Sequence, residues 1–143
     1  MDIRNINMNI GFNSYLVHFS PNQPLENALF QKILKAIPVD LPLEYVEFMR
    51  EYNGGEGRIG QDGKYVRFWP LEELIEANED YLVRDFAPGL FFIGSDGGDT
   101  ALGIRLSAKS FIEVPFIGMA DDEAIDRATG FENFLSYLES VHY

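Results

Sequence analysis

The stretch that decides the fold lies between residues 41 and 55 and reads Leu41-Pro42-Leu43-Glu44-Tyr45-Val46-Glu47-Phe48-Met49-Arg50-Glu51-Tyr52-Asn53-Gly54-Gly55. Its apolar residues recur every three or four positions, which places them on one face of a helix. Pro42 suits a first helical turn, where the missing N–H has no intrahelical partner, and Glu44 adds negative charge near the positive helix end. Asn-Gly-Gly accepts positive φ and ends the helix. The stretch predicts a helix over 43–52 that buries Tyr45, Phe48 and Met49.

Upstream of this helix, the sequence predicts a second amphipathic helix and a hairpin. The helix covers 25–37 and ends at Pro38. Its apolar face consists of Leu25, Leu29, Phe30, Ile33, Leu34 and Ile37. Residues 6–12 alternate between apolar and polar types, and residues 15–19 favour β structure, with a Gly-containing turn between them. These two segments predict an N-terminal β-hairpin.

Downstream, turn and strand signals alternate with helical ones. The expected elements are a Gly-rich turn region over 56–64, a strand over 65–69, a helix over 71–82, strands over 90–93, 100–106 and 111–117, an acidic loop or short helix over 118–129, and a helix over 131–138. Pro115 indicates an edge strand or a bend. The sum is a single domain of the α+β class, with helices packed on a mostly antiparallel sheet.

Several motifs occur in one order along the chain. They are Leu41-Pro42, Asn53-Gly54-Gly55, Phe68-Trp69-Pro70-Leu71-Glu72-Glu73-Leu74, Phe92-Ile93-Gly94-Ser95-Asp96-Gly97-Gly98-Asp99 and Phe131-Glu132-Asn133-Phe134-Leu135-Ser136-Tyr137-Leu138. In this order they resemble the SUKH superfamily, whose founding members include fungal cell-wall assembly regulators. The fourth motif departs from the family, since many members have three glycines there. The resemblance implies a SUKH-like domain over 24–143, preceded by an N-terminal extension over 1–23.

The charge of the chain bears on its partners. Lys plus Arg number 11 and Asp plus Glu number 23, which gives a net charge of −12. Such a surface repels nucleic acid, because phosphate binding needs clustered cations. It attracts a basic protein and accelerates the encounter. The alternative interpretation is that the acidity only keeps a small domain soluble.

Composition also bears on the compartment. The chain has no cysteine, which excludes disulfides, thiolate metal sites and a cysteine nucleophile and fits a reducing cytosol. Its apolar runs are far shorter than the roughly 20 residues of a membrane span. The first residues lack the basic flank and apolar stretch of a signal peptide. We therefore expect a soluble, cytoplasmic protein with no membrane partner.

Two groups of carboxylates are candidate sites. Asp96 and Asp99 flank two glycines and could hold a cation, but the further oxygen ligands of an EF-hand loop are missing. A tight turn with Asp side chains bonded to backbone N–H groups is therefore favoured. The densest acidic run comprises Asp121, Asp122, Glu123 and Asp126. It is either a solvated face or helix cap, or a contact patch for a basic protein.

Residues with catalytic potential are sparse. His18 and His142 are the only histidines and stand in unrelated contexts, which argues against a general base or a metal pair. The Gly-rich segment 54–57 lacks the Lys-Ser/Thr of a phosphate loop, and no serine sits in a nucleophile elbow. Trp69 is expected to anchor a core rather than to serve as a ligand platform. We predict no enzyme activity, no cofactor and no metal site.

The resemblance adds an expected role. Many bacterial SUKH proteins resemble immunity proteins, which bind and neutralise a cognate toxin, often a nuclease. A nuclease presents a cationic cleft to its substrate, so an acidic protein is suited to cover it. We expect a non-catalytic bacterial immunity protein that contacts a basic toxin encoded nearby through Asp121, Asp122, Glu123 and Asp126, with Asp96 and Asp99 as secondary contacts. The alternative is a regulatory or scaffold protein, because eukaryotic relatives resemble signalling adaptors.

Overall fold

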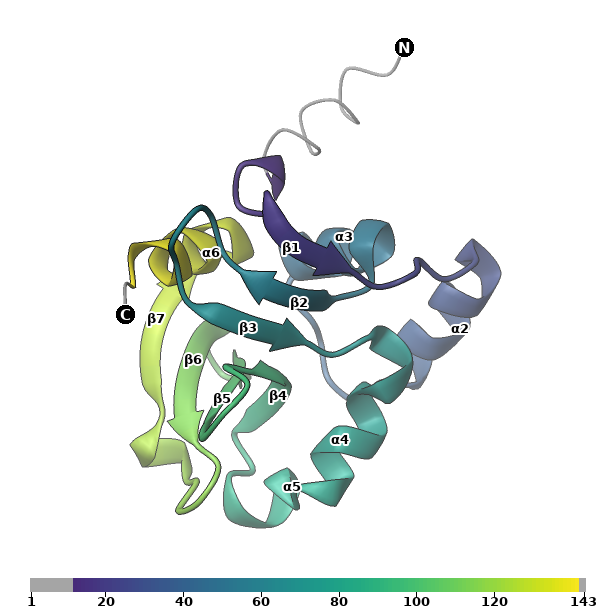
Figure 1. Cartoon of the computed structure of the whole chain (residues 1–143). Helices are drawn as coiled ribbons and strands as arrows, with labels where there is room; N and C mark the ends of the chain where they lie inside the picture. The colour runs from purple at the N-terminus through teal and green to yellow at the C-terminus, as the bar shows by residue number, and fades with distance from the viewer. Residues whose placement is uncertain (1–11, 142–143) are drawn as a thin grey trace.

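The computed structural model describes residues 12–141, which form an antiparallel seven-stranded sheet with helices packed against it (Figure 1). The strands follow one another across the sheet in chain order, so the topology is a meander. Their bounds are β1 (His18–Pro21), β2 (Gly55–Arg58), β3 (Tyr65–Phe68), β4 (Leu90–Ser95), β5 (Thr100–Arg105), β6 (Ser110–Pro115) and β7 (Ile125–Thr129). The expected α+β class and single domain are confirmed.

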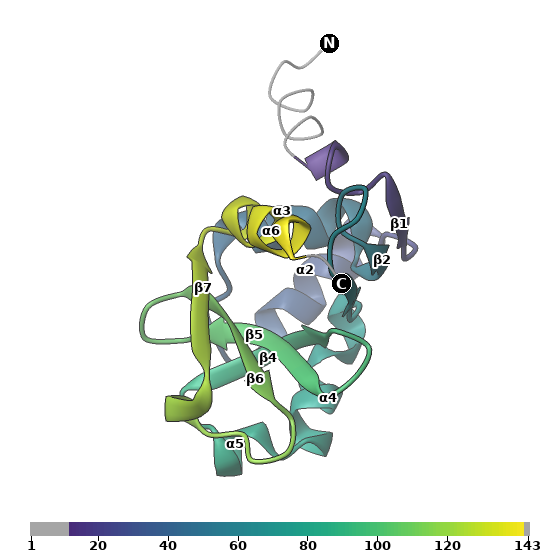
Figure 2. The same cartoon turned by 60° about the vertical axis from the view of Figure 1, so that its left-hand side comes forward.

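The helices lie between and beyond the strands. Their bounds are α2 (Asn27–Ala36), α3 (Leu43–Tyr52), the 3₁₀ turn η1 (Leu71–Glu73), α4 (Leu74–Asp80), α5 (Val83–Phe86), the 3₁₀ turn η2 (Asp121–Glu123) and α6 (Phe131–Ser140). Both views show α3 and α6 side by side at one end of the molecule, with α4 and α5 toward the other (Figures 1 and 2). The helices α3 and α6 therefore form the surface at one end of the domain, and α4 and α5 form the surface toward the other end (Figures 1 and 2).

The helix predicted over 43–52 is confirmed as α3, and its predicted core residues Tyr45, Phe48 and Met49 are fully buried. Phe131, the first residue of α6, packs on Phe48 with ring centroids 4.8 Å apart. Rings from the sheet complete this aromatic centre, and Phe68 lies 5.5 Å from Phe131. Ring pairs at these separations stabilise a core beyond the area that they bury.

The sheet separates two hydrophobic clusters. Successive residues of β4 alternate between them: Phe91 and Ile93 belong to the larger cluster with α3 and α6, whereas Leu90 and Phe92 belong to the smaller one. This alternation follows from the two-residue period of a strand. It also explains why β4 reads as a continuous apolar run, because both of its faces are covered.

The Asn-Gly-Gly motif, Asn53-Gly54-Gly55, determines how α3 ends and how β2 begins. Asn53 adopts the left-handed conformation (φ 54°), and its N–H bonds to the carbonyl of Met49 at 2.9 Å. A Cβ atom at Gly54 would collide with the carbonyl of Phe68, so only glycine lets β2 begin against the end of β3. The motif therefore ends the helix and starts the sheet in three residues.

Two strands differ from the expectation. The Gly-rich segment expected to be a turn region begins with strand β2, which lies between β1 and β3. Gly57 lies so close to the carbonyl of His18 that no side chain fits, so glycine there serves sheet packing. The acidic segment 118–129 contains not only a short helical turn but also β7, an edge strand whose residues are mostly exposed and polar. Its lack of apolar alternation hid it from a pattern-based prediction.

The first strand of the predicted N-terminal hairpin lies almost entirely outside the described residues. Segment 6–11 lies outside them, while Phe12 and Asn13 lie in a helical turn. Strand β1 pairs with β2. Among the described residues the neighbour of β1 is therefore β2, while the predicted pairing with segment 6–11 lies outside them.

Three smaller details also differ. Leu29, expected on the buried face of α2, is 44% exposed. The helix predicted over 71–82 is divided, since Leu82 adopts φ 57° and separates α4 from α5. Pro115 ends β6, an interior strand, and lies beyond the last pair with β7, which is Glu113 with Ile125. A proline is tolerated there because no β7 residue pairs with it.

Candidate functional site

Three connections between elements meet at one end of the domain. Tyr81, after α4, stacks on Phe116, after β6, with ring centroids 4.6 Å apart. The N–H of Phe116 bonds to the carbonyl of Asp99 in the β4–β5 turn at 2.9 Å. The N–H of Gly89 bonds to the carboxylate of Asp121 at 3.0 Å. Residues 79–86, 96–99 and 116–123 therefore form one region, which we call the acidic end.

The acidic end concentrates negative charge. Its carboxylates are Glu79, Asp80, Asp85, Asp96, Asp99, Asp121, Asp122 and Glu123, and Arg84 is the single cation in these three segments. The region contains α5 and the connection between β6 and β7, which lie together at the bottom of Figure 1. Because the segments are joined by direct contacts, their charges add up over a continuous surface and attract cations.

Large apolar side chains are exposed within the same region. Ile117 is 94% exposed, Phe86 59%, Leu82 50% and Tyr81 43%. Single exposed apolar residues are normal, but several on one contiguous end are typical of a recognition surface. Apolar side chains surrounded by charged ones form the usual anatomy of a protein–protein interface, with a buried centre and a polar rim.

Three of the six carboxylates that the sequence pointed to are held by the fold. Asp126 accepts hydrogen bonds from Ser110 at 2.7 Å and from Arg105 at 3.0 Å, and both bonds lower the pKa of this carboxyl below its usual value. Asp121 binds the N–H of Gly89, as described above. Asp96 accepts the N–H groups of Gly98 at 2.9 Å and Thr100 at 3.2 Å, the contacts of a tight turn.

The other three, Asp99, Asp122 and Glu123, are exposed. No hydrogen bond or ion pair to their side chains is found within residues 12–141. The structure therefore divides the predicted contact residues into two sets. One set positions the loops of the acidic end, and the other presents free carboxylates on it.

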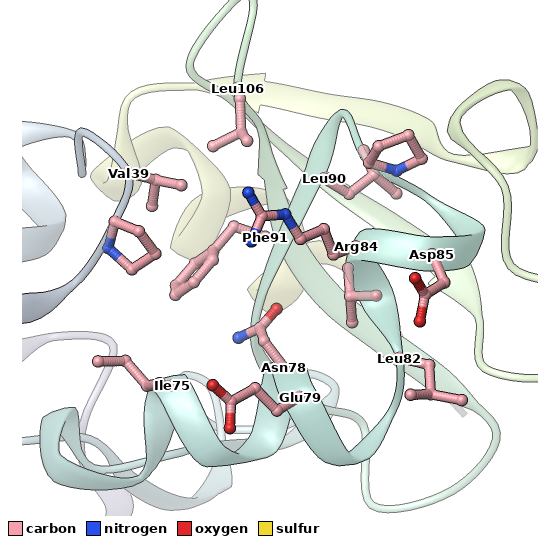
Figure 3. A pocket seen from close by; sticks show the side chains of 13 residues that line it. Val39, Ile75, Asn78, Glu79, Leu82, Arg84, Asp85, Leu90, Phe91 and Leu106 are labelled. Atoms are coloured by element: carbon pink, nitrogen blue, oxygen red, sulfur yellow. The ribbon is translucent and has the colours of Figure 1, made fainter.

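A pocket of about 530 Å³ opens at the border of the acidic end and shares residues 79 and 82–85 with it (Figure 3). It lies between α4, α5, the start of β4 and the connection from α2 to α3. The lining side chains are Pro38, Val39, Ile75, Asn78, Glu79, Leu82, Val83, Arg84, Asp85, Pro88, Leu90, Phe91 and Leu106. Most are apolar, and the charged ones belong to α4 and α5.

The beginning of β4 lines this pocket with Leu90 and Phe91, whose side chains are buried. Strand β3 pairs with the end of β4 through Arg67 and Phe68, and no strand within residues 12–141 pairs with the beginning of β4 on that side. The side chain of Asn78 takes the place of a neighbouring strand. Its amide oxygen accepts a hydrogen bond from the N–H of Phe92 at 2.8 Å, and its amide nitrogen donates one to the carbonyl of Phe92 at 2.9 Å. An amide side chain can pair with both groups of one residue, so α4 is fixed against β4 and the pocket remains open.

A second hollow, of about 510 Å³, lies between Trp69, Tyr81 and Phe116 on one side and the β4–β5 turn on the other. The rings of Trp69 and Tyr81 are nearly parallel, with centroids 6.0 Å apart. Trp69 is partly buried and packs against both hydrophobic clusters, so it anchors the core while one part of it faces the hollow. Asp99 lies at the border of this hollow.

Sequence reasoning did not identify the apolar part of the site. Leu82 and Phe86 continue the four-residue spacing of Leu74 and Asn78, so a periodic pattern would bury them. The left-handed conformation of Leu82 breaks that periodicity and exposes both side chains. The signal that would have revealed this, a positive φ at a leucine, cannot be read from residue types.

A buried charged cluster lies elsewhere. The carboxylate of Glu113 on β6 contacts Lys64 at 2.5 Å, Tyr137 at 2.7 Å and Arg127 at 2.8 Å. Lys64 also lies 3.9 Å from Asp96. Burial disfavours the charge on Glu113, but the hydrogen bonds from Lys64, Tyr137 and Arg127 outweigh it and lower its pKa. All these groups have partners, so we assign the cluster to structure.

Metal ligands, histidines and membrane-spanning helices are three further features to consider in the part of the chain that the structure describes. No three His, Cys, Asp or Glu side chains gather there in a way that would hold a metal ion. His18 bonds to Gln61 at 3.0 Å, while His142 lies outside residues 12–141. None of the helices within 12–141 combines the length and apolar character that crossing a membrane requires.

Comparison with known proteins agrees with the order of motifs along the chain. The sequence model of the SMI1 / KNR4 family (SUKH-1) matches residues 24–137, which include α2, the Asn-Gly-Gly motif, the sheet from β2 to β7 and most of α6. No curated protein sequence matches the chain. Because the match covers most of the 143 residues, the chain belongs to the SMI1 / KNR4 (SUKH-1) family.

Proposed function

We propose that this chain is a non-catalytic protein-binding domain of the immunity type, which binds a basic toxin through the acidic end and neutralises it. The observation that carries the proposal is the combination of three free carboxylates, Asp99, Asp122 and Glu123, with exposed apolar side chains on one surface. Family membership is consistent with a non-catalytic immunity or regulatory domain. The chemistry of the surface favours a basic protein as the partner.

A nuclease is the toxin class that fits this surface best. A nuclease must present a cationic cleft to bind its substrate, and a protein of net charge −12 competes for that cleft. Apolar anchors at the centre of the contact would slow dissociation, and the surrounding carboxylates would accelerate association. Exposed Ile117 and Phe86 are the natural anchors, since binding would remove the most apolar surface from water there.

The proposal predicts that a basic toxin is encoded beside this protein, and the test uses the domain of that toxin. Co-expression should restore growth to cells that produce the toxin, and the purified protein should abolish nuclease activity at a 1:1 ratio. The test variant combines Asp99→Lys, Asp122→Lys and Glu123→Lys. It should remain folded and should protect the cells poorly. Full protection by this variant would exclude the acidic end as the contact surface.

The regulatory alternative predicts a different outcome of the same experiment. A scaffold would bind a basic protein without inhibiting any activity, and the bound protein need not be toxic. Binding without protection would therefore replace the immunity function with a scaffold function. Failure to bind any basic protein encoded nearby would overturn both.

A further inference from the structure

The pocket beside the acidic end is built to receive an apolar group. Its walls come from segments far apart in the sequence: Val39 before α3, Ile75 on α4, Phe91 on β4 and Leu106 after β5 (Figure 3). Pockets of about 300–1,000 Å³ hold organic ligands of moderate size, so about 530 Å³ admits a large side chain together with part of its backbone. Asn78, the uncharged polar side chain of the lining, is already bonded to β4.

Leu82 connects this pocket to the exposed apolar surface. It lines the pocket, is half exposed, and adopts φ 57°, a conformation that a leucine side chain disfavours and that glycine or asparagine accepts readily. A leucine here gives the pocket an apolar margin at the expense of backbone strain. A partner that covers the acidic end would contact this margin.

Arg84 is the residue of the pocket that favours an aromatic ring over an aliphatic side chain. Its guanidinium extends from α5 toward the middle of the pocket, in the direction of Phe91 and Val39 (Figure 3). It forms no hydrogen bond, ion pair or ring contact within residues 12–141. The other arginines of that range do have partners, namely Arg50, Arg58, Arg67, Arg105 and Arg127. A guanidinium over an apolar pocket stacks favourably on an inserted aromatic ring.

The margin of the pocket is acidic. Glu79 on α4 and Asp85 on α5 both line it, and neither forms an ion pair with Arg84. Carboxylates at the margin favour basic residues on either side of the inserted group. They disfavour a free anionic ligand, which would have to approach Arg84 through the field of a chain with net charge −12.

From this combination we infer that the pocket is the anchor site for an aromatic side chain that a basic partner presents between lysine or arginine residues. The inference rests on the proposed function, because it names what the partner inserts. The apolar walls exclude water from the ring, Arg84 stacks on its face, and Glu79 and Asp85 pair with the flanking cations. An aliphatic side chain would fill the pocket without using Arg84.

The experiment uses the full chain labelled with ¹⁵N and two peptides, Lys-Lys-Phe-Lys-Lys and its matched control Lys-Lys-Ala-Lys-Lys. The phenylalanine peptide should shift the amide signals of Ile75, Leu82 and Phe91 in a saturable way and bind about tenfold more tightly than the control, as burial of a phenylalanine side chain requires. Equal affinities, or shifts restricted to residues 96–99 and 116–123, would overturn the inference.

Two variants test separately what the apolar margin and the guanidinium of Arg84 contribute to peptide affinity. Leu82→Asn preserves the left-handed conformation and removes the apolar margin, so the phenylalanine peptide should bind several-fold more weakly while the midpoint of urea unfolding does not fall. Arg84→Gln should weaken the phenylalanine peptide about threefold or more and leave the alanine peptide unweakened. Unchanged affinity of the phenylalanine peptide for both variants would exclude the pocket.

Failure of this inference differs visibly from failure of the proposed function. If the basic toxin binds Leu82→Asn as tightly as the unmodified protein but does not bind the variant with reversed charges at Asp99, Asp122 and Glu123, the acidic end is the interface and the pocket is not part of it. If toxin affinity falls in the charge-reversed variant, in Leu82→Asn and also in Arg84→Gln, the pocket is an anchor within that interface.

Discussion

The side-chain oxygen of Asn53 accepts a hydrogen bond from the backbone N–H of Leu71 at 2.9 Å. The amide nitrogen of the same side chain donates to Glu72 at 3.0 Å and to the carbonyl of Gln23 at 3.2 Å. Asn53 is nearly fully buried, so these bonds satisfy groups that water does not reach. One residue of the Asn-Gly-Gly motif thus joins the end of α3, the segment before α2 and the start of η1.

Two substitutions at Asn53 should distinguish the contribution of its side-chain hydrogen bonds to stability from the contribution of its left-handed backbone conformation. Asn53→Gly keeps the left-handed conformation and loses the bonds, so we expect it to lower the free energy of unfolding by about 2–3 kcal/mol. Asn53→Ala loses both and should cost roughly 1 kcal/mol more. Urea unfolding followed by circular dichroism measures both values. Equal stability of Asn53→Gly and the unmodified protein would show that the bonds contribute little.

Tyr45 offers a stabilising substitution. Its ring packs in the larger core, but its hydroxyl is buried and has no hydrogen-bond partner among the described residues. Burial also raises the pKa of this hydroxyl. Tyr45→Phe removes an unsatisfied polar group and keeps the ring, so unfolding free energy should rise by about 1 kcal/mol. Tyr45→Leu, which keeps an apolar side chain but removes the ring, should lower it. A lower thermal midpoint for Tyr45→Phe would contradict this.

Glu113 should make stability depend on pH. Although its burial favours the neutral acid, bonds from Lys64, Tyr137 and Arg127 lower its pKa in the folded state. A carboxyl with a depressed folded pKa stabilises the fold fully above its unfolded pKa, about 4.3. That contribution is lost as the pH falls below this value and through the folded pKa.

The test for Glu113 compares two matched substitutions. Glu113→Gln should cost about 3 kcal/mol at pH 7, because Lys64 and Arg127 lose their buried counter-charge. It should also reduce the loss of stability between pH 5 and pH 3. Glu123→Gln, at an exposed carboxyl that has no partner within residues 12–141, should change neither. Urea unfolding at several pH values measures both effects, and parallel pH profiles for Glu113→Gln and the unmodified protein would contradict the assignment.

The sequence predicted those elements whose signals are local. Helices α3 and α6 were predicted because apolar period and end residues agree within ten positions. Strand β2 was not, because its glycines are explained only by the approach of His18 and Phe68 from other strands. Strand β7 was not either, since an exposed edge strand has no apolar face to reveal it.

The candidate site was predictable in composition and not in detail. The sequence identified the carboxylates, but it could not show that Asp121 binds Gly89 and that Asp126 binds Arg105, because these partners lie 32 and 21 positions away. It could not reveal the exposed Leu82 and Phe86 either, since a single left-handed residue exposes them. Tertiary contacts, rather than residue types, decide which acidic residues are free.

Charge reversal at the acidic end should slow association with the basic partner. The variant combines Asp99→Lys, Asp122→Lys and Glu123→Lys and leaves Asp121 and Asp126 unchanged, because those two hold Gly89 and Arg105 in place. We expect the association rate constant to fall roughly tenfold or more at low salt, since these carboxylates steer the encounter. Thermal unfolding should show that the variant is folded, as its three positions have no partners within the described chain.

A matched control distinguishes the effect of the acidic end on association from the effect of the net charge of the protein. Glu26→Lys, Glu47→Lys and Glu132→Lys together change the charge by the same amount just before α2, on α3 and on α6, away from the acidic end. The Debye length shrinks from about 30 Å at 0.01 M to about 8 Å at physiological ionic strength, so distant charges are screened first. At physiological salt the control should therefore associate at nearly the unmodified rate, whereas the acidic-end variant should remain slow. Stopped-flow measurements over this range of salt provide the test, and equal slowing of both variants at every ionic strength would show that net charge, and not the acidic end, attracts the partner.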